Sequence, residues 1–334
     1  MRFAFFDAKP YDLPGFEKYG NERGISFKFY ETRLNEDTAG LAHGCDGVCC
    51  FVNDTVNAAV IDELVNCGCK VLALRCAGFN NVDLMVAKNR LRVVRVPAYS
   101  PHAVAEHAMA MLLTVVRRTH RAYLRTKDFN FSLSGLTGFD LHGKTVGVVG
   151  TGKIGRAFLD ICRGFGMNVL AYDKFPGEAV SFRYVPLDEL LRESDVISLH
   201  CPLTDETYHL IDGDAIASMK KGAILVNTSR GAPIDTDALI EGIKARQIGA
   251  ACLDVYEEES DVFFEDFSGH IVEDDTLARL LSLPNVLVTS HQAFLTKEAL
   301  DNIAETTVDN IVSLRDTGSC VNEIGFARQV SGIR

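Results

Sequence analysis

The chain has 334 residues, about twice the length of a typical domain, which predicts two domains. Hydrophobic residues make up 47% and charged residues 24%, a balance that excludes wholesale disorder. The formal net charge of −11 disfavours nucleic acid and anionic membrane surfaces, so we expect neither partner. The sequence shows no apolar stretch that could span a bilayer and no secretory signal core, so we expect a cytoplasmic protein.

The ten cysteines raise the question of a metal site or a disulfide framework. Their spacings are CxxxCC and CxC rather than paired CxxC, and most lie in apolar runs. We therefore predict no metal site and interpret them as buried structural thiols in a reducing compartment. Six of them fall close together in the first part of the chain, at Cys45, Cys49, Cys50, Cys67, Cys69 and Cys76.

The first hundred residues alternate short apolar runs with segments of helical period, which predicts parallel strands covered by helices. A helix is expected over 57–66, and one long helix from Pro101 to Thr126, buried against something large such as another subunit. The expected strands are 3–6, 25–30, 47–52, 70–74 and 93–96.

A second alternating series begins at Thr145, and its runs lack the polar–apolar alternation of half-exposed strands. A last helix is expected over 297–315, and the nine acidic residues between Glu257 and Asp275 predict a solvated loop. The expected strands of this series are 145–150, 168–173, 196–200, 223–227, 249–255 and 285–290, with helices over 154–165, 187–192 and 235–245.

The sequence GTGKIG, from Gly150 to Gly155, follows one of these strands and opens a helix. That context is the one in which Gly150, Gly152 and Gly155 bring a backbone close to a dinucleotide pyrophosphate. The next strand ends on Asp173, whose carboxylate is placed to accept hydrogen bonds from a ribose and to repel a 2′-phosphate. We therefore predict NAD rather than NADP, although the neighbouring Lys174 weakens the distinction.

Three further side chains follow later strands, where the ligands of open α/β sheets bind. An arginine, an acid and a histidine at such positions suit a 2-keto acid reductase, with a carboxylate anchor and a proton donor. Each also has a structural alternative, as an ion-pair residue, a member of the acidic run or a buried histidine. These residues are Arg230, Glu259 and His291.

The stretches GTGKIG, HCPLT, NTSRG, DVYEEE and SHQAF, in this order, resemble the D-isomer-specific 2-hydroxyacid dehydrogenase family. RCAGFNNVD and VPAYSPHAVAEH are similar to its first domain and domain junction, so the resemblance covers nearly the whole chain. Within the family, the long acidic connection after Glu259 and the sequence QAFLT after His291 look most like the fermentative D-lactate dehydrogenases.

The resemblance implies that His291 is the acid/base, Glu259 its carboxylate partner and Arg230 the substrate anchor. It also implies that the backbone amides of Ala77 and Gly78 meet the substrate carboxylate and that Tyr99 lies over the site. The implied cofactor contacts are Lys153 and Ile154 at the pyrophosphate, Asp173 at the ribose, Cys201, Pro202 and Thr207 near the adenosine, and Thr228, Ser229, Arg230 and Asp254 at the nicotinamide.

The expected fold is two Rossmann- or flavodoxin-like doubly wound parallel-sheet domains with a cleft between them. Residues 1–98 and 297–334 are expected to form the substrate domain, and 99–296 the inserted NAD domain. We expect a homodimer or homotetramer assembled through the NAD domain.

The expected reaction is the reduction of pyruvate to D-lactate by NADH. Phe51 and Phe294 are expected to limit the pocket to a methyl group, unless both are simply core residues. Two alternatives remain: a larger 2-keto acid (2-ketoisocaproate, phenylpyruvate) or hydroxypyruvate as substrate, and an NADH-sensing corepressor that is not a metabolic enzyme.

Overall fold

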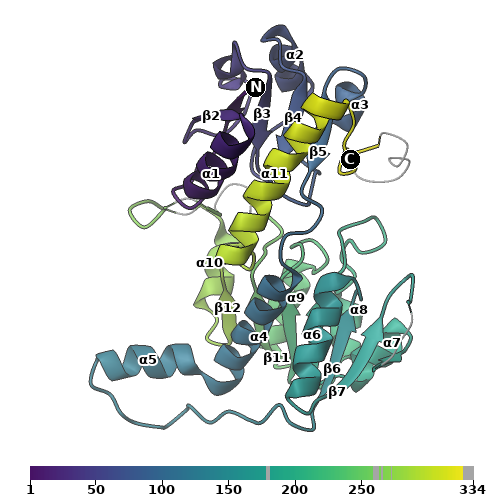
Figure 1. Ribbon diagram of the computed structural model, residues 1–334. Helices are drawn as coiled ribbons and strands as arrows, with labels where there is room; N and C mark the ends of the chain where they lie inside the picture. The colour runs from purple at the N-terminus through teal and green to yellow at the C-terminus, as the bar shows by residue number, and fades with distance from the viewer. Residues whose placement is uncertain (178–180, 259–262, 265, 272, 326–334) are drawn as a thin grey trace. The chain divides into compact units, whose positions relative to one another are not determined.

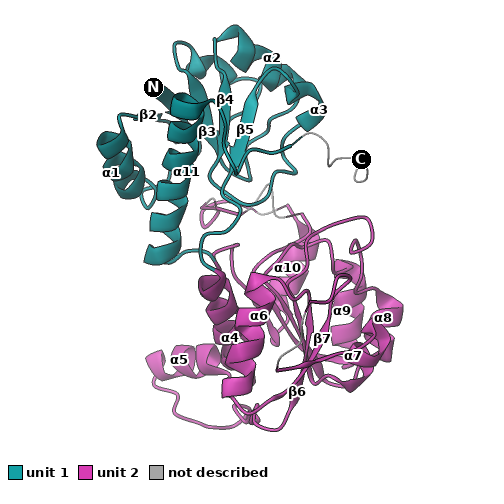
Figure 2. Ribbon diagram, turned by 45° about the vertical axis from the view of Figure 1, so that its right-hand side comes forward, with its two compact units in different colours: residues 1–100, 294–331 teal, residues 101–293, 332–334 magenta. Residues whose placement is uncertain are grey.

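The structure, a computed structural model, describes residues 1–177, 181–258, 263–264, 266–271 and 273–325. The chain divides into two compact units, shown in different colours in Figure 2. One unit comprises Met1–Ser100 and the C-terminal segment from Phe294, and the other comprises Pro101–Ala293. The predicted domain junctions at 98/99 and 296/297 lie within three residues of these boundaries.

The N-terminal unit is built on a five-stranded parallel sheet with the strand order β2-β1-β3-β4-β5. This is the flavodoxin-like order, in which the carboxyl end of the sheet carries the ligand. Because the central strands are covered on both faces, every residue of β3 and β4 is buried. The strands are β1 (Arg2–Phe5), β2 (Ser26–Phe29), β3 (Gly47–Cys50), β4 (Val71–Leu74) and β5 (Arg92–Arg95).

The last helix of the chain, α11 (Lys297–Thr317), returns to this unit and lies beside α1 (Figure 1). The close approach depends on Gly15, where an added Cβ would lie 2.9 Å from the Ala304 Cβ. The Thr296 side chain caps α11 by accepting a hydrogen bond from the Ala299 amide. The other helices of the unit are α1 (Leu13–Arg23), the 3₁₀ helix η1 (Ala39–Ala42), α2 (Ala58–Asn66) and α3 (Leu84–Ala87).

The second unit has a seven-stranded parallel sheet with the order β12-β11-β10-β9-β6-β7-β8. The chain starts in the middle at β6, winds to one edge and then to the other, which is the Rossmann order. The two sheets together confirm the predicted class of two doubly wound α/β units. The strands are β6 (Thr145–Val149), β7 (Asn168–Tyr172), β8 (Arg183–Tyr184), β9 (Val196–Leu199), β10 (Ala223–Asn227), β11 (Ile248–Leu253) and β12 (Val286–Val288).

Helices cover both faces of this sheet. On one face α4 (Pro101–Arg117) and α6 (Lys153–Gly164) pack together, and Leu112 and Phe158 are fully buried there. The other face is covered by helices that bury leucine and isoleucine side chains, including Leu190 and Ile240. Those helices are α7 (Leu187–Glu193), α8 (Gly213–Ser218), α9 (Thr236–Lys244) and α10 (Asp275–Ser282).

The long helix predicted to run from Pro101 to Thr126 is wrong, because the structure has two helices there. Arg118 adopts a left-handed backbone with φ 54° and separates α4 from α5 (Thr119–Lys127). The segment after α5 passes back beside this break, and Arg118 donates a hydrogen bond to the carbonyl oxygen of Gly135 in that segment at 2.6 Å. At Gly138 an added Cβ would lie only 2.2 Å from the Val116 carbonyl oxygen. The interruption is therefore set by contacts distant in sequence.

Nine of the ten cysteines are buried as free thiols, and Cys320 is half-buried. Burial raises the pKa of the Cys69 thiol to about 12. Among the described residues, no group of three or more His, Cys, Asp or Glu side chains is arranged to hold a metal ion. The described helices also include none with the length and apolar composition needed to cross a membrane.

Candidate active site

The glycine-rich turn between β6 and α6 requires glycine at Gly150 and Gly155 and leaves open space at Gly152. Gly150 has φ 93°, and an added Cβ there would lie 2.7 Å from the His200 carbonyl oxygen. A Cβ on Gly155 would lie 2.0 Å from the Gly150 carbonyl oxygen, so the helix can pack this closely only with glycine. At Gly152, the residue before Lys153 and Ile154, no described atom outside the adjoining stretch of chain lies within 4 Å of an added Cβ. That open space at a helix N-terminus fits a pyrophosphate.

Asp173 follows β7 and faces the glycine turn. Its carboxylate accepts hydrogen bonds from the Thr151 amide at 2.6 Å, the Thr151 hydroxyl at 2.9 Å and the Phe175 amide at 2.9 Å. Burial opposes its ionisation, but these hydrogen bonds outweigh that effect and lower the pKa of Asp173. The neighbouring Lys174 is paired with Glu206 instead. A negative charge therefore stands at the position expected to meet the ribose.

The residues expected beside the adenosine follow β9. Cys201 is buried, and burial raises the pKa of its thiol to about 11. The Thr207 hydroxyl donates to the Pro202 carbonyl oxygen at 2.7 Å and accepts from the Thr204 amide at 2.8 Å. These hydrogen bonds fold the segment into a compact turn at the carboxyl end of the sheet.

The turn after β10 carries Thr228, Ser229 and Arg230 and is fixed by Asn227. The Asn227 amide group donates to the Arg230 carbonyl oxygen at 2.6 Å, and its oxygen accepts from the Ser229 amide at 3.0 Å. Arg230 also donates through Nη1 to the Ser229 carbonyl oxygen at 2.6 Å. The Thr228 hydroxyl is buried without a hydrogen-bond partner among the described residues, which fits a polar ligand group at this place. The role of Asn227 was missed, although its place at the end of a buried strand is a signal for it.

Asp254, after β11, is fully buried and organises the segment that carries His291 after β12. Its carboxylate accepts from the Thr289 hydroxyl at 2.5 Å, the Gln292 amide at 3.0 Å and the Ala293 amide at 2.9 Å. Its carbonyl oxygen accepts from the His291 amide at 2.7 Å. These bonds surround His291, whose left-handed backbone (φ 51°) non-glycine residues rarely adopt.

His107, on α4, adds a third side chain to this network, after those of Asp254 and Thr289. Its Nε2 lies 3.2 Å from both an Asp254 carboxylate oxygen and the Thr289 hydroxyl. Burial opposes the ionisation of Asp254, but hydrogen bonds from His107, Thr289 and the Ala293 amide outweigh that effect and lower the pKa of Asp254. Asp254 is therefore held as a buried, fully hydrogen-bonded carboxylate.

Of the three consecutive glutamates after Tyr256, the first, Glu257, has side-chain partners in the structure. Glu257 accepts hydrogen bonds from the Thr236 hydroxyl at 3.2 Å and lies 2.8 Å from the His209 Nε2. It is thus engaged at the start of α9. Glu259, the expected partner of His291, lies outside the described residues.

In the N-terminal unit the expected substrate residues follow β3, β4 and β5 at the carboxyl end of the sheet. The Phe294 ring lies 5.9 Å from that of Phe51 and 6.2 Å from that of Tyr99, measured between centroids. Phe51 is 9% exposed and Phe294 is 7% exposed. The Ala77 carbonyl oxygen, beside Gly78, accepts from Arg95 at 2.7 Å. The structure therefore gathers these rings into one cluster.

Comparisons with known proteins agree with this arrangement. Residues 109–293 match the model of the D-isomer specific 2-hydroxyacid dehydrogenase NAD binding domain. The D-lactate dehydrogenase of Escherichia coli is 52% identical over 97% of this chain and 100% of its own length. The chain belongs to the D-isomer-specific 2-hydroxyacid dehydrogenase family.

Solved structures place this dehydrogenase more closely within the family. The Salmonella D-lactate dehydrogenase superposes with a TM-score of 0.86 at 52% identity, covering 97% of this chain and 100% of the other. A D-2-hydroxyisocaproate dehydrogenase gives the same TM-score, 0.86, at 31% identity, covering 97% and 99%. The relatives found are dehydrogenases, which does not favour the NADH-sensing corepressor.

NAD is the cofactor of this dehydrogenase, and the residues of its Rossmann unit fit that ligand. The open space at Gly152, the ionised Asp173 and the unpartnered Thr228 hydroxyl lie at the ends of β6, β7 and β10. Because parallel strands end at one edge of the sheet, these features share one edge.

The side chains that hold Phe51 in place were missed by sequence reasoning. Asp54 accepts hydrogen bonds from the Phe51 and Leu34 amides, both at 2.6 Å. Asn81 donates to the Phe51 carbonyl oxygen at 2.8 Å, and the Arg75 guanidinium carbon lies 4.9 Å from the Phe51 ring centroid. Arg75 and Asn81 belong to the RCAGFNNVD motif, so that motif was the available signal.

Proposed function

We propose that this dehydrogenase reduces pyruvate to D-lactate with NADH. The observation that carries the proposal is the pair of phenyl rings of Phe51 and Phe294, 5.9 Å apart and almost fully buried. Two packed rings leave room beside the keto carbon for a methyl group and little more. The 52% identity to a D-lactate dehydrogenase over its whole length supports the same substrate.

The proposed roles follow from the chemistry of each side chain. Arg230 anchors the substrate carboxylate through its planar guanidinium, together with the backbone amides of Ala77 and Gly78. His291 donates the proton to the ketone oxygen, and Glu259 stabilises the protonated imidazole. Tyr99 closes over the substrate.

When bound, NADH supplies the hydride that reduces the ketone carbon. His291 gives its proton to the oxygen as that carbon becomes tetrahedral, so the product is a hydroxyl group and the histidine is left neutral. Arg230 stabilises the negative charge that develops on the oxygen during the transfer. Asp254 and His107 hold the segment that orients His291.

The proposed cofactor contacts follow the carboxyl ends of the Rossmann strands. Lys153 and Ile154 meet the pyrophosphate, Asp173 the ribose, and Cys201, Pro202 and Thr207 the adenosine. Thr228, Ser229, Arg230 and Asp254 surround the nicotinamide, where the buried Thr228 hydroxyl lacks a partner among the described residues.

A larger 2-keto acid or hydroxypyruvate is the alternative substrate. The D-2-hydroxyisocaproate dehydrogenase superposes equally well on this chain but shares only 31% identity. Because the fold alone does not determine the substrate, the choice between pyruvate and these alternatives depends on the side chains around Phe51.

The test is kcat/KM for purified enzyme with pyruvate, hydroxypyruvate, 2-ketoisocaproate and phenylpyruvate, each with NADH and with NADPH. We expect pyruvate with NADH to give the highest value. A higher value for any other acid would replace pyruvate as the substrate. Turnover of none of the four acids would contradict the reductase function itself.

We also propose that the chain forms a homodimer or homotetramer through its NAD-binding unit. Five large apolar side chains gather on α5 and the segment after it, each at least 59% exposed: Tyr123, Leu124, Phe129, Phe131 and Leu133. A cluster of exposed apolar side chains of this size is typical of a protein–protein interface. Sedimentation equilibrium should give a mass of two or four chains, and Phe129→Ser with Phe131→Ser should lower it.

A cytoplasmic location is proposed from the cysteines. Nine buried thiols without a disulfide suit a reducing compartment. Cell fractionation with an antibody to the chain would test this, and recovery from a secreted or membrane fraction would contradict it.

A further inference from the structure

Positive charge is concentrated in one short segment of this acidic protein. Between residues 117 and 127 there are six basic residues and no carboxylate, in a chain whose net charge is −11. The catalytic proposal uses none of them. The six are Arg117, Arg118, His120, Arg121, Arg125 and Lys127.

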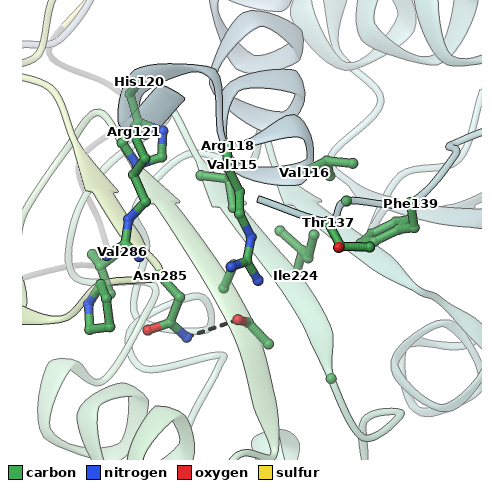
Figure 3. A pocket seen from close by; sticks show the side chains of 15 residues that line it. Val115, Val116, Arg118, His120, Arg121, Thr137, Phe139, Ile224, Asn285 and Val286 are labelled. Atoms are coloured by element: carbon green, nitrogen blue, oxygen red, sulfur yellow. Dashed lines mark hydrogen bonds between the residues drawn. The ribbon is translucent and has the colours of Figure 1, made fainter. Parts of the chain in front are cut away.

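Three of these side chains line a pocket of about 210 Å³ at the amino-terminal end of the Rossmann sheet (Figure 3). Ile224, Ala250 and Val286, which lie at or near the starts of β10, β11 and β12, form its floor. Arg230 and His291 follow the opposite ends of β10 and β12. The pocket is therefore separate from the edge of the sheet expected to bind NAD.

The cations of this pocket lack counter-charges. Its lining includes Arg118, His120 and Arg121 and no aspartate or glutamate. No carboxylate of the described residues lies within ion-pair distance of either arginine, and the only hydrogen bond that the Arg118 side chain makes with the described residues goes to the Gly135 carbonyl oxygen. The His120 Nδ1 atom is buried without a hydrogen-bond partner in the same part of the chain.

The arrangement has the chemistry of an anion site. Half-buried guanidinium groups that have lost part of their hydration are stabilised by an anion, and their forked N–H groups match phosphate and carboxylate oxygens. Figure 3 shows Arg118 and Arg121 extending from the helical segment toward the part of the pocket near Asn285. The Thr137 hydroxyl adds another donor at the opposite wall.

We propose that this pocket binds a small polyanion carrying phosphate or carboxylate groups. Its volume is below the roughly 300–1,000 Å³ of sites for drug-sized ligands, which favours a compact anion over a nucleotide. None of the five exposed apolar side chains proposed for subunit contact lines it, although His120 and Arg121 lie on the same helix, α5, as two of them, so the test uses the assembled enzyme. It does not depend on which 2-keto acid the enzyme reduces.

The test is calorimetric titration of the NADH-saturated enzyme at constant ionic strength. Saturation with NADH occupies the glycine turn, so that a phosphate cannot bind there. Inorganic phosphate, pyrophosphate and succinate are titrated separately, and the three arms distinguish phosphate from carboxylate ligands. We expect saturable binding of at least one of them at one site per subunit.

Arg121→Gln is the principal variant because the Arg121 side chain makes no hydrogen bond or ion pair with the described residues, so its loss should not disturb folding. It should weaken anion binding at least tenfold while kcat for the 2-keto acid stays within twofold. Arg163→Gln on α6 removes the same charge from an exposed side chain paired with Asp160, and should leave binding unchanged.

Three results would overturn the proposal. One is the absence of saturable binding with all three anions. Another is that Arg121→Gln and Arg163→Gln weaken anion binding equally, which would indicate only a general electrostatic attraction between the anion and the protein. The third is dissociation of the assembly by Arg121→Gln without anion binding by the parent enzyme, because a second copy of the chain would then be the occupant.

Discussion

The main-chain carbonyl oxygen of Asp254 accepts a hydrogen bond from the His291 amide at 2.7 Å, and the Asp254 carboxylate binds the two amides that follow His291. One buried residue thus holds the proposed proton donor on both sides. A left-handed backbone at a histidine costs free energy and persists only where surrounding contacts fix it. Asp254 supplies those contacts.

Asp254→Asn should therefore damage both stability and catalysis. An asparagine must present an NH₂ group to the Gln292 or Ala293 amide, which leaves buried donors facing each other. We expect the free energy of unfolding to fall by about 3 kcal/mol, the scale for buried hydrogen bonds to a charged group. We expect kcat/KM to fall about a hundredfold through misplacement of His291.

The matched control is Asp212→Asn, which makes the same change at the exposed cap of α8. Asparagine caps helices as well as aspartate does, so this variant should be nearly neutral. Urea unfolding followed by circular dichroism and steady-state kinetics measure both effects. If Asp254→Asn behaved like its control, the positioning role of Asp254 would be wrong.

The acid/base pair is tested by His291→Ala and Glu259→Gln. His291→Ala should lower kcat/KM for reduction by about 10²–10⁴-fold, the usual contribution of a positioned acid. Glu259→Gln keeps the shape but removes the charge that stabilises the protonated imidazole. The alkaline fall of kcat/KM should then move to lower pH, while part of the activity at acid pH survives.

Glu257→Gln is the control for this pair, because Glu257 is already engaged by His209 and Thr236. Its pH profile should match that of the parent enzyme. A profile that moved with Glu257→Gln but not with Glu259→Gln would show that the wrong glutamate had been chosen.

Phe51→Val should enlarge the substrate pocket. We expect the ratio of kcat/KM for phenylpyruvate to that for pyruvate to rise about tenfold or more, because the ring that limits the pocket is gone. Phe29→Val on β2 is the matched control, since the Phe29 ring packs against Phe5 at 5.0 Å, away from the Phe51 cluster. Unchanged ratios in a folded Phe51→Val enzyme would mean that Phe51 is only a core residue.

Asp173→Ser should relax the preference for NADH over NADPH. The serine hydroxyl can still accept from the Thr151 amide, but the charge that repels a 2′-phosphate is lost. We expect kcat/KM for NADPH relative to NADH to rise about tenfold, which corresponds to about 1.4 kcal/mol. Asp188→Ser removes one exposed charge on α7 and should leave the ratio unchanged. A parent enzyme that used both cofactors equally would contradict the role of Asp173.

Asp54 should make stability depend on pH in a direction opposite to that of most carboxylates. Burial raises its pKa to about 6 in the folded chain, although Arg75 opposes the shift. The folded state therefore binds the proton more tightly than the unfolded state, and stability falls as the pH rises from about 4 to about 6. A shift of about two units corresponds to about 3 kcal/mol.

The measurement is urea unfolding by circular dichroism at several pH values for the parent enzyme and for Asp54→Asn. Between pH 4 and 7 the free energy of unfolding of the parent should fall relative to that of the variant. If the difference in unfolding free energy between the parent and the variant stayed constant over this pH range, the Asp54 carboxyl would titrate normally in the folded chain. If the parent became more stable relative to the variant as the pH rose, the folded chain would favour the ionised form of Asp54.

The sequence alone was sufficient for the architecture and for the cofactor. Runs of buried β-branched residues alternating with helical periods determine parallel sheets, because such strands must be covered on both faces. The turn from Gly150 to Gly155 and the acid at Asp173 predict the place of the NAD site locally, since the functions proposed for them depend on backbone conformation and on neighbours close in sequence. The family likewise follows from short motifs.

Only the tertiary structure decided features that depend on distant contacts. The break at Arg118 is set by a segment that returns past Gly138, and helical periodicity cannot register such a contact. The pairing of Asp254 with His107 joins residues 147 positions apart in the chain (254 − 107), and Phe51 meets Phe294 from the other end of it. Side-chain packing and buried hydrogen bonds join residues that are distant in sequence. A local sequence pattern can therefore identify the functional side chains but cannot predict which distant residues they contact.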